Sequence, residues 1–380
     1  MKNLLLPLAA LLMGASTSAQ DVFALTGKSS SQIIFNDFRA LDLQNDNSGR
    51  SIFSAESVPN VFSQRLKSKF AEAKGTYHNS QFQVMANLAE DQAGNLIYTP
   101  MYSSNVYVIN RKSGNLTLVE NSVIKTTACD ISSHFTRMAS GYDGAVYLLN
   151  NAGTSLVKIT NNRGEYALED LGAVKTVSND PAISLSVMTS GYGGDMVADA
   201  ENNFYIFAAS GNVFKLNTGK MEAVFVGKID GLPENYSLNG AAVLENGKVM
   251  VASAKGSGFY QVDINSLQAT AMNKGNGLPV YDLASNNFLN NRGIAGLHKG
   301  AAIEIYPTKI DQEHVNIRAP KGTYQLEVFD AAGSRVHSGK MSVSGEEKID
   351  LQSLTKGVYI INVKDESGKI LATRKVIVTR

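Results

Sequence analysis

The stretch DQAGNLIY, residues Asp91 to Tyr98, joins a turn to an apolar run, and the same arrangement recurs three times further along the chain. Each copy opens with an acidic residue and a turn pair. The four pairs are Gly94-Asn95, Asp143-Gly144, Asn202-Asn203 and Asn246-Gly247. Because Gly, Asn and Asp tolerate the positive φ that tight hairpins require, we expect a β-hairpin at each pair.

Two short β-runs follow each turn. The first runs are Leu96–Tyr98, Val146–Leu148, Phe204–Phe207 and Val249–Val251, and the second runs are Val106–Ile109, Leu156–Ile159, Val213–Leu216 and Phe259–Val262. A third run and a preceding apolar stretch bring each unit to about four strands. The turn markers Gly94, Gly144, Asn202 and Asn246 lie 50, 58 and 44 residues apart. A period of about 50 residues with four strands is typical of one blade of a β-propeller.

A fifth unit begins at Leu278–Ser285, but the repeat pattern then stops. Propellers commonly complete their last sheet with strands from both ends of the repeat region, which removes an exposed sheet edge. The apolar stretch Ser31–Leu43 is our candidate for those strands. We therefore predict an all-β chain with a β-propeller of five or six blades over residues 20–295. A pair of stacked β-sandwiches, which has the same hairpin signals, is the alternative.

One segment has the spacing of a helix. Phe62, Leu66 and Phe70 recur every four residues in PNVFSQRLKSKFAEAKGTY, which starts at Pro59, and this spacing places them on one helix face. Asn60 and Gly75 are suitable first and last caps. We expect a solvated helix here.

Composition and the amino terminus restrict the class of protein. The chain has 380 residues and a formal net charge of +1, and so lacks the basic excess that nucleic acid or an anionic membrane attracts. Residues 1–19 combine Lys2, an apolar stretch and small residues, which predicts a signal peptide cleaved after Ala19. No later stretch is long and apolar enough to span a membrane. The single cysteine, Cys129, excludes an intramolecular disulfide, and we expect it to be buried as a small hydrophobic residue.

The repeats offer few catalytic candidates. The five histidines are scattered and no hydrolase, P-loop, zinc or EF-hand motif is present, so we assign neither catalytic residues nor metal ligands. Asp91, Asp143, Asp199 and Glu245 recur at related repeat positions, where turn formation explains them, although hard cations such as Ca²⁺ prefer these oxygen ligands. The motif M-x-S-G-Y-x-G occurs at Met138 and Met188. Packing at strand ends would explain its tyrosines, Tyr142 and Tyr192. As the alternative, these tyrosines with Asp143 and Asp199 are our candidates for ligand-facing residues.

The pattern changes after the Asn- and Gly-rich stretch Asn286–Ala302, of which residues 296–302 are the predicted linker. Residues 303–380 alternate apolar and polar positions, as in Tyr324, Leu326 and Val328, with turns at Asp330–Gly333 and Glu366–Lys369. Six or seven short strands at this spacing predict a small C-terminal β-sandwich.

This module resembles the type A C-terminal sorting domain of the type IX secretion system. The resemblance rests on IEIYP, YQLEVFDAAGSRV, IDLQSLTKGVYIINV and the basic end TRKVIVTR, with Pro307, Gly333, Leu354, Gly357 and Tyr359 at the motif positions. The segment YPTKI departs from the family's usual Pro-Asn-Pro start. The resemblance implies export across the outer membrane of a Gram-negative bacterium, followed by release or attachment to the surface. The repeats resemble uncharacterised secreted propeller-like proteins with the same tail.

These observations lead to two functional hypotheses. The first is a secreted or cell-surface binding protein of propeller type, whose ligand is a glycan or a peptide, with no cofactor. The second is a secreted hydrolase or lyase that uses carboxylates, and calcium if a metal is needed, at the propeller axis. In both, the machinery of type IX secretion is a partner.

Overall fold

The computed structural model describes residues 22–27, 35–43, 46–54, 61–70, 85–275, 277–289, 303–306, 309–310, 314–365, 368 and 370–379. The chain divides into two compact units, residues 20–292 and residues 293–380, the second grouped with residues 1–19. The regular secondary structure of the described residues is β-strand, as the sequence predicts, apart from one 3₁₀ turn, η1 (Ile131–Ser133), and one short helix, α1 (Met188–Gly191). The predicted signal peptide, residues 1–19, lies outside the described part.

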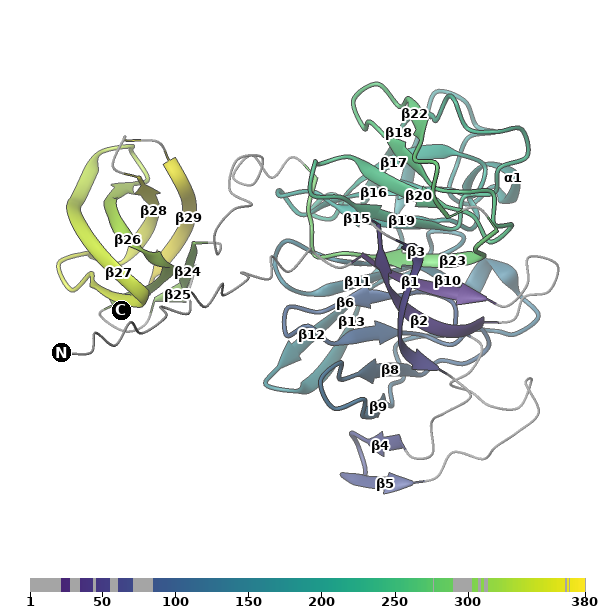
Figure 1. Ribbon diagram of the computed structural model, residues 1–380, viewed down its shortest axis with the longest axis horizontal. Helices are drawn as coiled ribbons and strands as arrows, with labels where there is room; N and C mark the ends of the chain where they lie inside the picture. Colours follow the sequence, from purple (N-terminus) through teal and green to yellow (C-terminus); the bar gives the residue numbers. More distant parts are fainter. Residues whose placement is uncertain are drawn as a thin grey trace, which may run out of the picture. The chain divides into compact units, whose positions relative to one another are not determined.

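The described residues of the first unit form five mainly antiparallel sheets, of which four follow one another in sequence (Figure 1). Sheet 1 is β6 (Ala89–Glu90), β7 (Leu96–Tyr98), β8 (Val106–Ile109) and β9 (Leu116–Val119), extended by β4 (Val61–Ser63) and β5 (Ser68–Phe70). Sheet 2 is β10 (Phe135–Ser140), β11 (Val146–Asn150), β12 (Leu156–Asn162) and β13 (Glu165–Gly172). Sheet 3 is β15 (Asp195–Ala198), β16 (Asn203–Phe207), β17 (Asn212–Asn217) and β18 (Glu222–Lys228), with β14 (Lys175–Val177) added in parallel to β18. Sheet 4 is β19 (Gly240–Val243), β20 (Val249–Ala252), β21 (Tyr260–Val262) and β22 (Ala269–Ala271).

Sheet 5 joins the two ends of this unit. Its strand order is β23 (Val280–Ala284), β1 (Val22–Gly27), β2 (Phe35–Asp42) and β3 (Asp46–Ser54). The predicted stretch Ser31–Leu43 thus contributes β2, whereas β1, which pairs directly with β23, was not predicted.

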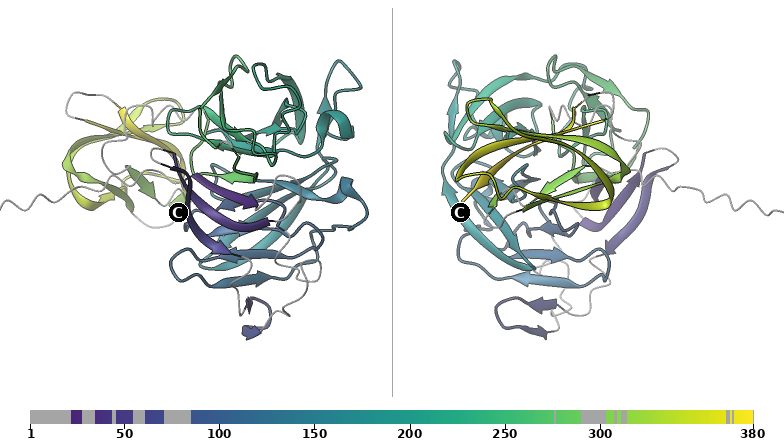
Figure 2. Two further views of the ribbon diagram at one scale, coloured as in Figure 1. Left: turned by 45° about the vertical axis from the view of Figure 1, so that its right-hand side comes forward. Right: turned by 90° about the vertical axis from the view of Figure 1, so that its left-hand side faces the viewer.

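The first strands of the five sheets, β6, β10, β15, β19 and β23, lie beside one another in a closed cycle, and we call them the inner strands. Both faces of most sheets are apolar, as the fully buried strands β11, β16 and β20 illustrate. Five hydrophobic cores result, each between two neighbouring sheets. The sheets therefore surround a common centre (Figure 2).

The predicted helix from Pro59 is wrong over its described residues. Residues 61–70 form the hairpin of β4 and β5, and β4 pairs in parallel with the outer strand β9. Pairing buries Val61 completely, whereas Leu66, predicted on the apolar helix face, is exposed at the turn. The open edge of β9 offers hydrogen bonds and apolar contacts to Val61, and these tertiary contacts outweigh local helix spacing.

The second unit contains β24 (Glu304–Tyr306), β25 (Lys309–Ile310), β26 (His314–Asp330), β27 (Arg335–Asp350), β28 (Gly357–Lys364) and β29 (Ile370–Val378). These strands form one continuous six-stranded sheet instead of the two separate sheets of a β-sandwich. The long strands β26 and β27 carry an irregularity between Ala319 and Gly322. Val315 and Leu326, on either side of it, share one hydrophobic core, so the sheet folds onto itself.

Candidate functional site

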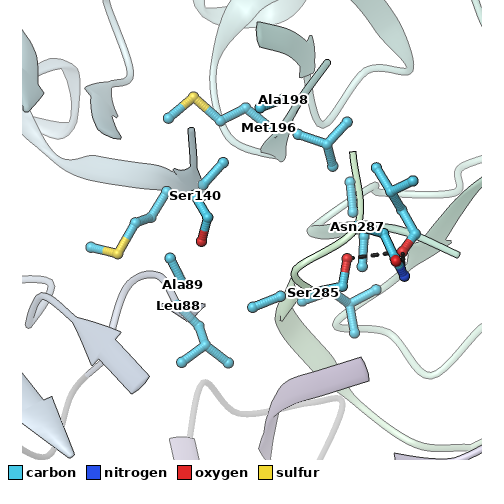
Figure 3. Close-up of a pocket in the computed structure, with 15 residues that line it drawn as sticks. Leu88, Ala89, Ser140, Met196, Ala198, Ser285 and Asn287 are labelled. Carbon is cyan, nitrogen blue, oxygen red and sulfur yellow. Dashed lines mark hydrogen bonds between the residues drawn. The ribbon is translucent and has the colours of Figure 1, made fainter. Parts of the chain in front are cut away.

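Two cavities lie at the centre of the five sheets, and residues in or near every sheet line each of them. The larger axial cavity, of about 220 Å³, is lined by residues at or near the starts of the inner strands and by residues that follow the second strands of sheets 1 and 4. The first set is Ala86, Thr136, Gly193, Gly194, Ser237, Asn239 and Tyr281, and the second set is Met101, Ala254 and Lys255. The smaller axial cavity, of about 20 Å³, is lined by later residues of the inner strands. Figure 3 shows this smaller cavity, with Leu88, Ser140, Met196 and Ser285 around it.

The larger axial cavity combines apolar and polar groups. Met101 and Tyr281 supply apolar surface, and Lys255 is the one charged residue among those that line it. The Lys255 Nζ donates to the carbonyl oxygen of Asn235 at 3.3 Å, and the side chain is exposed. The Asn239 side-chain oxygen accepts the amide N–H of Ala254 at 3.0 Å, which fixes the amide group at the cavity wall. Such a wall suits a small ligand with both apolar and hydrogen-bonding surface.

Between the two cavities, each inner strand, or the segment leading into it, places one residue at the same level. The residue that follows it in the chain lines the smaller cavity, namely Leu88, Met138, Met196, Ala241 and Leu283. The five residues at this level, which we call the polar belt, are Asn87, Arg137, Asp195, Gly240 and Asp282. All five are buried, and four of them are polar or charged.

Each side chain of the polar belt bonds to the backbone of the next inner strand or of the residues leading into it. The Asn87 amide donates to Phe135 O at 2.8 Å, and the Arg137 Nε donates to Gly193 O at 3.1 Å. The Asp195 carboxylate accepts the N–H of Ala241 at 2.7 Å, and Asp282 accepts that of Leu88 at 2.8 Å. The belt thus satisfies backbone groups on the open edges of the inner strands, which have no further strand to pair with.

Only glycine fits at position 240, because the next inner strand, β23, approaches Gly240 closely. A Cβ at this position would lie 2.8 Å from both the backbone nitrogen and the Cγ of Leu283. Direct packing of β19 against β23 therefore replaces the hydrogen bond that the other belt members make.

The titratable side chains of the polar belt have shifted pKa values. Burial raises the pKa of Asp195 to about 7, and hydrogen bonds from backbone N–H groups oppose that rise. Burial and the neighbouring Asp195 carboxylate raise the pKa of Asp282 well above its ordinary value. Burial lowers the pKa of Arg137 to about 10, so the guanidinium stays charged at neutral pH and the Asp195 carboxylate stabilises it. The two carboxyl groups hydrogen-bond to each other, which requires a proton between them.

The belt carboxyl groups do not open into the larger cavity. Asp195 and Asp282 are 0% exposed, and each binds two backbone N–H groups. Their observed contacts hold the ring together. The sequence contained a signal for them, because each Asp stands inside an apolar run, GGDMVA and PVYDLA, where a buried charge needs partners.

The structure does not bring Tyr142 and Tyr192 together. Tyr142 follows the end of β10 and packs edge-on against Phe288, with ring centroids 5.2 Å apart. Tyr192 instead precedes β15, next to the Gly193 that lines the larger cavity. Gly193 lies near the start of β10, where Arg137 binds its carbonyl oxygen. The two copies of the M-x-S-G-Y-x-G motif thus occupy different places in their units, with Met138 in β10 and Met188 in α1.

The repeated acidic residues also differ in position. Asp91 and Asp199 open equivalent five-residue turns, each with N–H groups bonded to the carboxylate, whereas Asp143 is third and Glu245 second in their turns. Asp143 is exposed and accepts bonds from Tyr147 Oη and Lys158 Nζ, both at 2.8 Å. Asp199 is buried and pairs with Lys215 at 3.3 Å. The turns behave as predicted, with positive φ at Gly94, Gly144, Asn202 and Gly247.

In the part of the chain that the structure describes, no three His, Cys, Asp or Glu side chains are grouped to hold a metal ion. The prediction for Cys129 is wrong, because this thiol is free and exposed. Cys129 lies in the connection between β9 and η1, where neighbouring residues are also exposed, so no core is available to bury it.

The sorting motif residues have structural roles in the second unit. Gly333 has a φ of +83° in the turn between β26 and β27, where other residues would be strained. Leu354 and Tyr359 belong to the core, and the Tyr359 hydroxyl donates to Thr355 O at 2.9 Å. Gly357 begins β28. Pro307 lies outside the described residues.

Comparison with known proteins gives one family match and several distant structural likenesses. No curated protein matches the sequence. A protein of unknown function from Bacteroides caccae is 12% identical, covers 94% of each chain and has a TM-score of 0.36. The extracellular domain of a putative one-component system from B. thetaiotaomicron is 12% identical with a TM-score of 0.34, and 90% of this chain spans 48% of that one.

PorZ, an essential surface component of the type-IX secretion system of Porphyromonas gingivalis, is 11% identical with a TM-score of 0.27, and 94% of this chain covers 51% of it. The described residues contain no helix with the length and hydropathy of a membrane span. Residues 304–379 match the family model of the secretion system C-terminal sorting domain. These residues are therefore a sorting domain of the type IX secretion system, and the protein that carries it is exported through the periplasm to the cell surface or the medium.

Proposed function

We propose that residues 20–295 form a five-bladed β-propeller that binds a small part of a glycan or peptide in the larger axial cavity, outside the cell. The five sheets, their cyclic order and the pairing of β1 with β23 support this fold. The observation that carries the binding function is the cavity of about 220 Å³, which is lined by residues in or near all five sheets. A volume just below the range of about 300–1,000 Å³ for drug-sized ligands suits a single sugar ring or a single side chain.

The lining favours recognition over catalysis. Tyr281 and Met101 offer apolar surface, while Ser237, Asn239 and Lys255 offer hydrogen-bonding groups and one positive charge. The acidic side chains that directly follow lining residues, Asp195 and Asp282, are engaged in the polar belt. A glycosidase needs two carboxyl groups that reach the substrate from opposite sides. We therefore rank binding above the hydrolase or lyase alternative.

Binding is tested with the exported protein on glycan and peptide arrays, followed by titration calorimetry of the best probe. We expect Ser237→Tyr, which fills the cavity, and Lys255→Ala, which removes its cation, each to weaken binding at least tenfold, or about 1.4 kcal/mol. Lys228→Ala, on the outer strand β18, is the matched control and should bind normally. Equal affinity for all four proteins would rule out this cavity.

The enzymatic alternative has a separate test. Calcium would have to raise the melting temperature, because a ligand that binds only the folded state stabilises it. Asp143→Asn or Asp199→Asn would have to abolish that rise, and the array probe would have to be cleaved. Those results together would show that the protein is an enzyme and would overturn the proposal of a binding protein.

A further inference from the structure

The sorting domain exposes an unusual amount of apolar surface for its size. Among the described residues of the whole chain, twelve large hydrophobic side chains are exposed, and five of them belong to this small unit. They are Val336, Val358, Ile360, Ile370 and Ile377, with exposed fractions between 38% and 51%. Scattered apolar residues on a surface need no explanation, but a contiguous group marks an interaction site.

Strand register places most of these residues next to one another. Val358 is directly opposite Ile377, and Ile360 is directly opposite Phe329, which is half-buried. On β28 the neighbours Tyr359 and Ile361 are buried, so Val358 and Ile360 share the outer face. Phe329, Ile360, Val358 and Ile377 thus form a stripe across the three neighbouring strands β26, β28 and β29, which we call the apolar stripe.

Positive charges border the apolar stripe. Lys375 is the cross-strand partner of Ile360, and Arg335 is the partner of Phe329. The Glu327 carboxylate forms ion pairs with two cations, Lys364 at 2.5 Å and Arg335 at 3.1 Å. The carboxylate of Asp330 accepts two backbone N–H groups of its own turn. The stripe with its border therefore fits an apolar surface with carboxylates at its edge.

We propose that the apolar stripe is the surface by which a protein of the type IX secretion machinery recognises this domain, and that the partner presents an apolar patch bordered by acidic side chains. A sorting domain must be recognised by a protein, and the inward faces of its strands are buried in the hydrophobic core. Alternation leaves the outer face of the same strands for that contact. The inference is independent of the ligand proposed for the propeller.

The test follows export in the bacterium that makes the protein, as the ratio of surface plus medium to periplasm. We expect Ile360→Glu and Ile377→Glu each to lower that ratio at least tenfold, because a buried carboxylate in an apolar contact is costly and also repels an acidic border. Lys375→Glu should lower it less. The control is Lys348→Glu, which puts the same side chain at an exposed position on the other half of β27 and should be exported normally.

Folding and self-association are measured on the purified full-length variants. Unchanged melting of Ile360→Glu, together with lost export, supports the proposal. If that variant melts early, Val358→Thr and Ile360→Thr, which keep β-branched side chains, replace it in the export assay. Normal export of the stripe variants, or an equal loss in Lys348→Glu, overturns the proposal. A wild-type dimer in sedimentation that Ile360→Glu dissociates without loss of export would assign the stripe to a second copy of the chain instead.

Discussion

At the residue scale, the most informative side chains are the buried carboxyl groups of Asp195 and Asp282. Their oxygens accept the backbone N–H groups of Ala241 in β19 and of Leu88 just before β6, which leaves little room for solvent or substrate. A protein that buries two carboxyl groups side by side must keep a proton between them, because two adjacent buried negative charges repel strongly. Stability should therefore depend on pH in a specific direction.

The folded-state pKa of Asp195, about 7, lies above the value of about 3.9 for an unfolded chain, and that of Asp282 is also raised. The folded state therefore binds more protons than the unfolded state between these values. The resulting stability is fully present below about pH 4 and is lost as pH rises through 7. Asparagine cannot ionise. We therefore expect the melting temperature of Asp195→Asn to fall less between pH 5 and pH 9 than that of the wild type. Parallel pH profiles would show that the pair does not share a proton.

At the element scale, β1 is the strand on which the ring depends. It lies between β23 and β2, so that strands from the two ends of the unit meet in one sheet. Leu25 in β1 is fully buried in the core between sheets 5 and 1, opposite Asp282 on one side and Phe38 on the other. Disruption at Leu25 should therefore separate the first and last elements of the unit.

We expect Leu25→Asp to lower the melting temperature by roughly 10 °C or more, since burying an unpaired charge costs several kcal/mol and each kcal/mol is worth about 2–4 °C in a domain of this size. Differential scanning calorimetry of the exported protein measures the shift. Arg50→Asp, at an exposed position of β3, introduces the same side chain and should melt close to the wild type. A similar, small shift in both variants would mean that sheet 5 is dispensable for the fold.

At the scale of the whole molecule, each unit has its own hydrophobic core. The first unit holds five cores between its sheets, and the second holds a single core inside its folded sheet. Units with separate cores are expected to fold independently. The sorting domain is therefore expected to direct export without contributing to the fold of the first unit.

A chain truncated after Ala302 should accumulate in the periplasm and should retain the melting transition of the first unit. Cell fractionation measures the location, and calorimetry of the purified truncated protein measures the fold. Appearance of the truncated chain in the medium would refute the role of residues 304–379 in export. Loss of its melting transition would instead refute the independence of the two units.

The repeating turns could be read directly from the sequence. Glycine or asparagine at Gly94, Gly144, Asn202 and Gly247 is a local requirement of a backbone with positive φ, and apolar runs of β-branched and aromatic residues identify the strands beside them. The sorting motif could also be recognised from the sequence, because its residues form turns and a small hydrophobic core within one short stretch of chain. These features depend on neighbours in sequence, which a single chain displays.

Only the tertiary structure decided the remaining features. The apolar residues of the segment 61–70 have helical spacing, but the segment forms a hairpin. Its strand β4 pairs with the open edge of β9, which is far away in sequence. Tyr142 and Tyr192 share a motif, yet one follows an inner strand and the other precedes one. The polar belt exists because five segments, from Asn87 to Asp282, meet at one level around the centre. Sequence determines which backbone shapes and faces are available locally, whereas the meeting of distant strand edges determines which polar groups must satisfy one another.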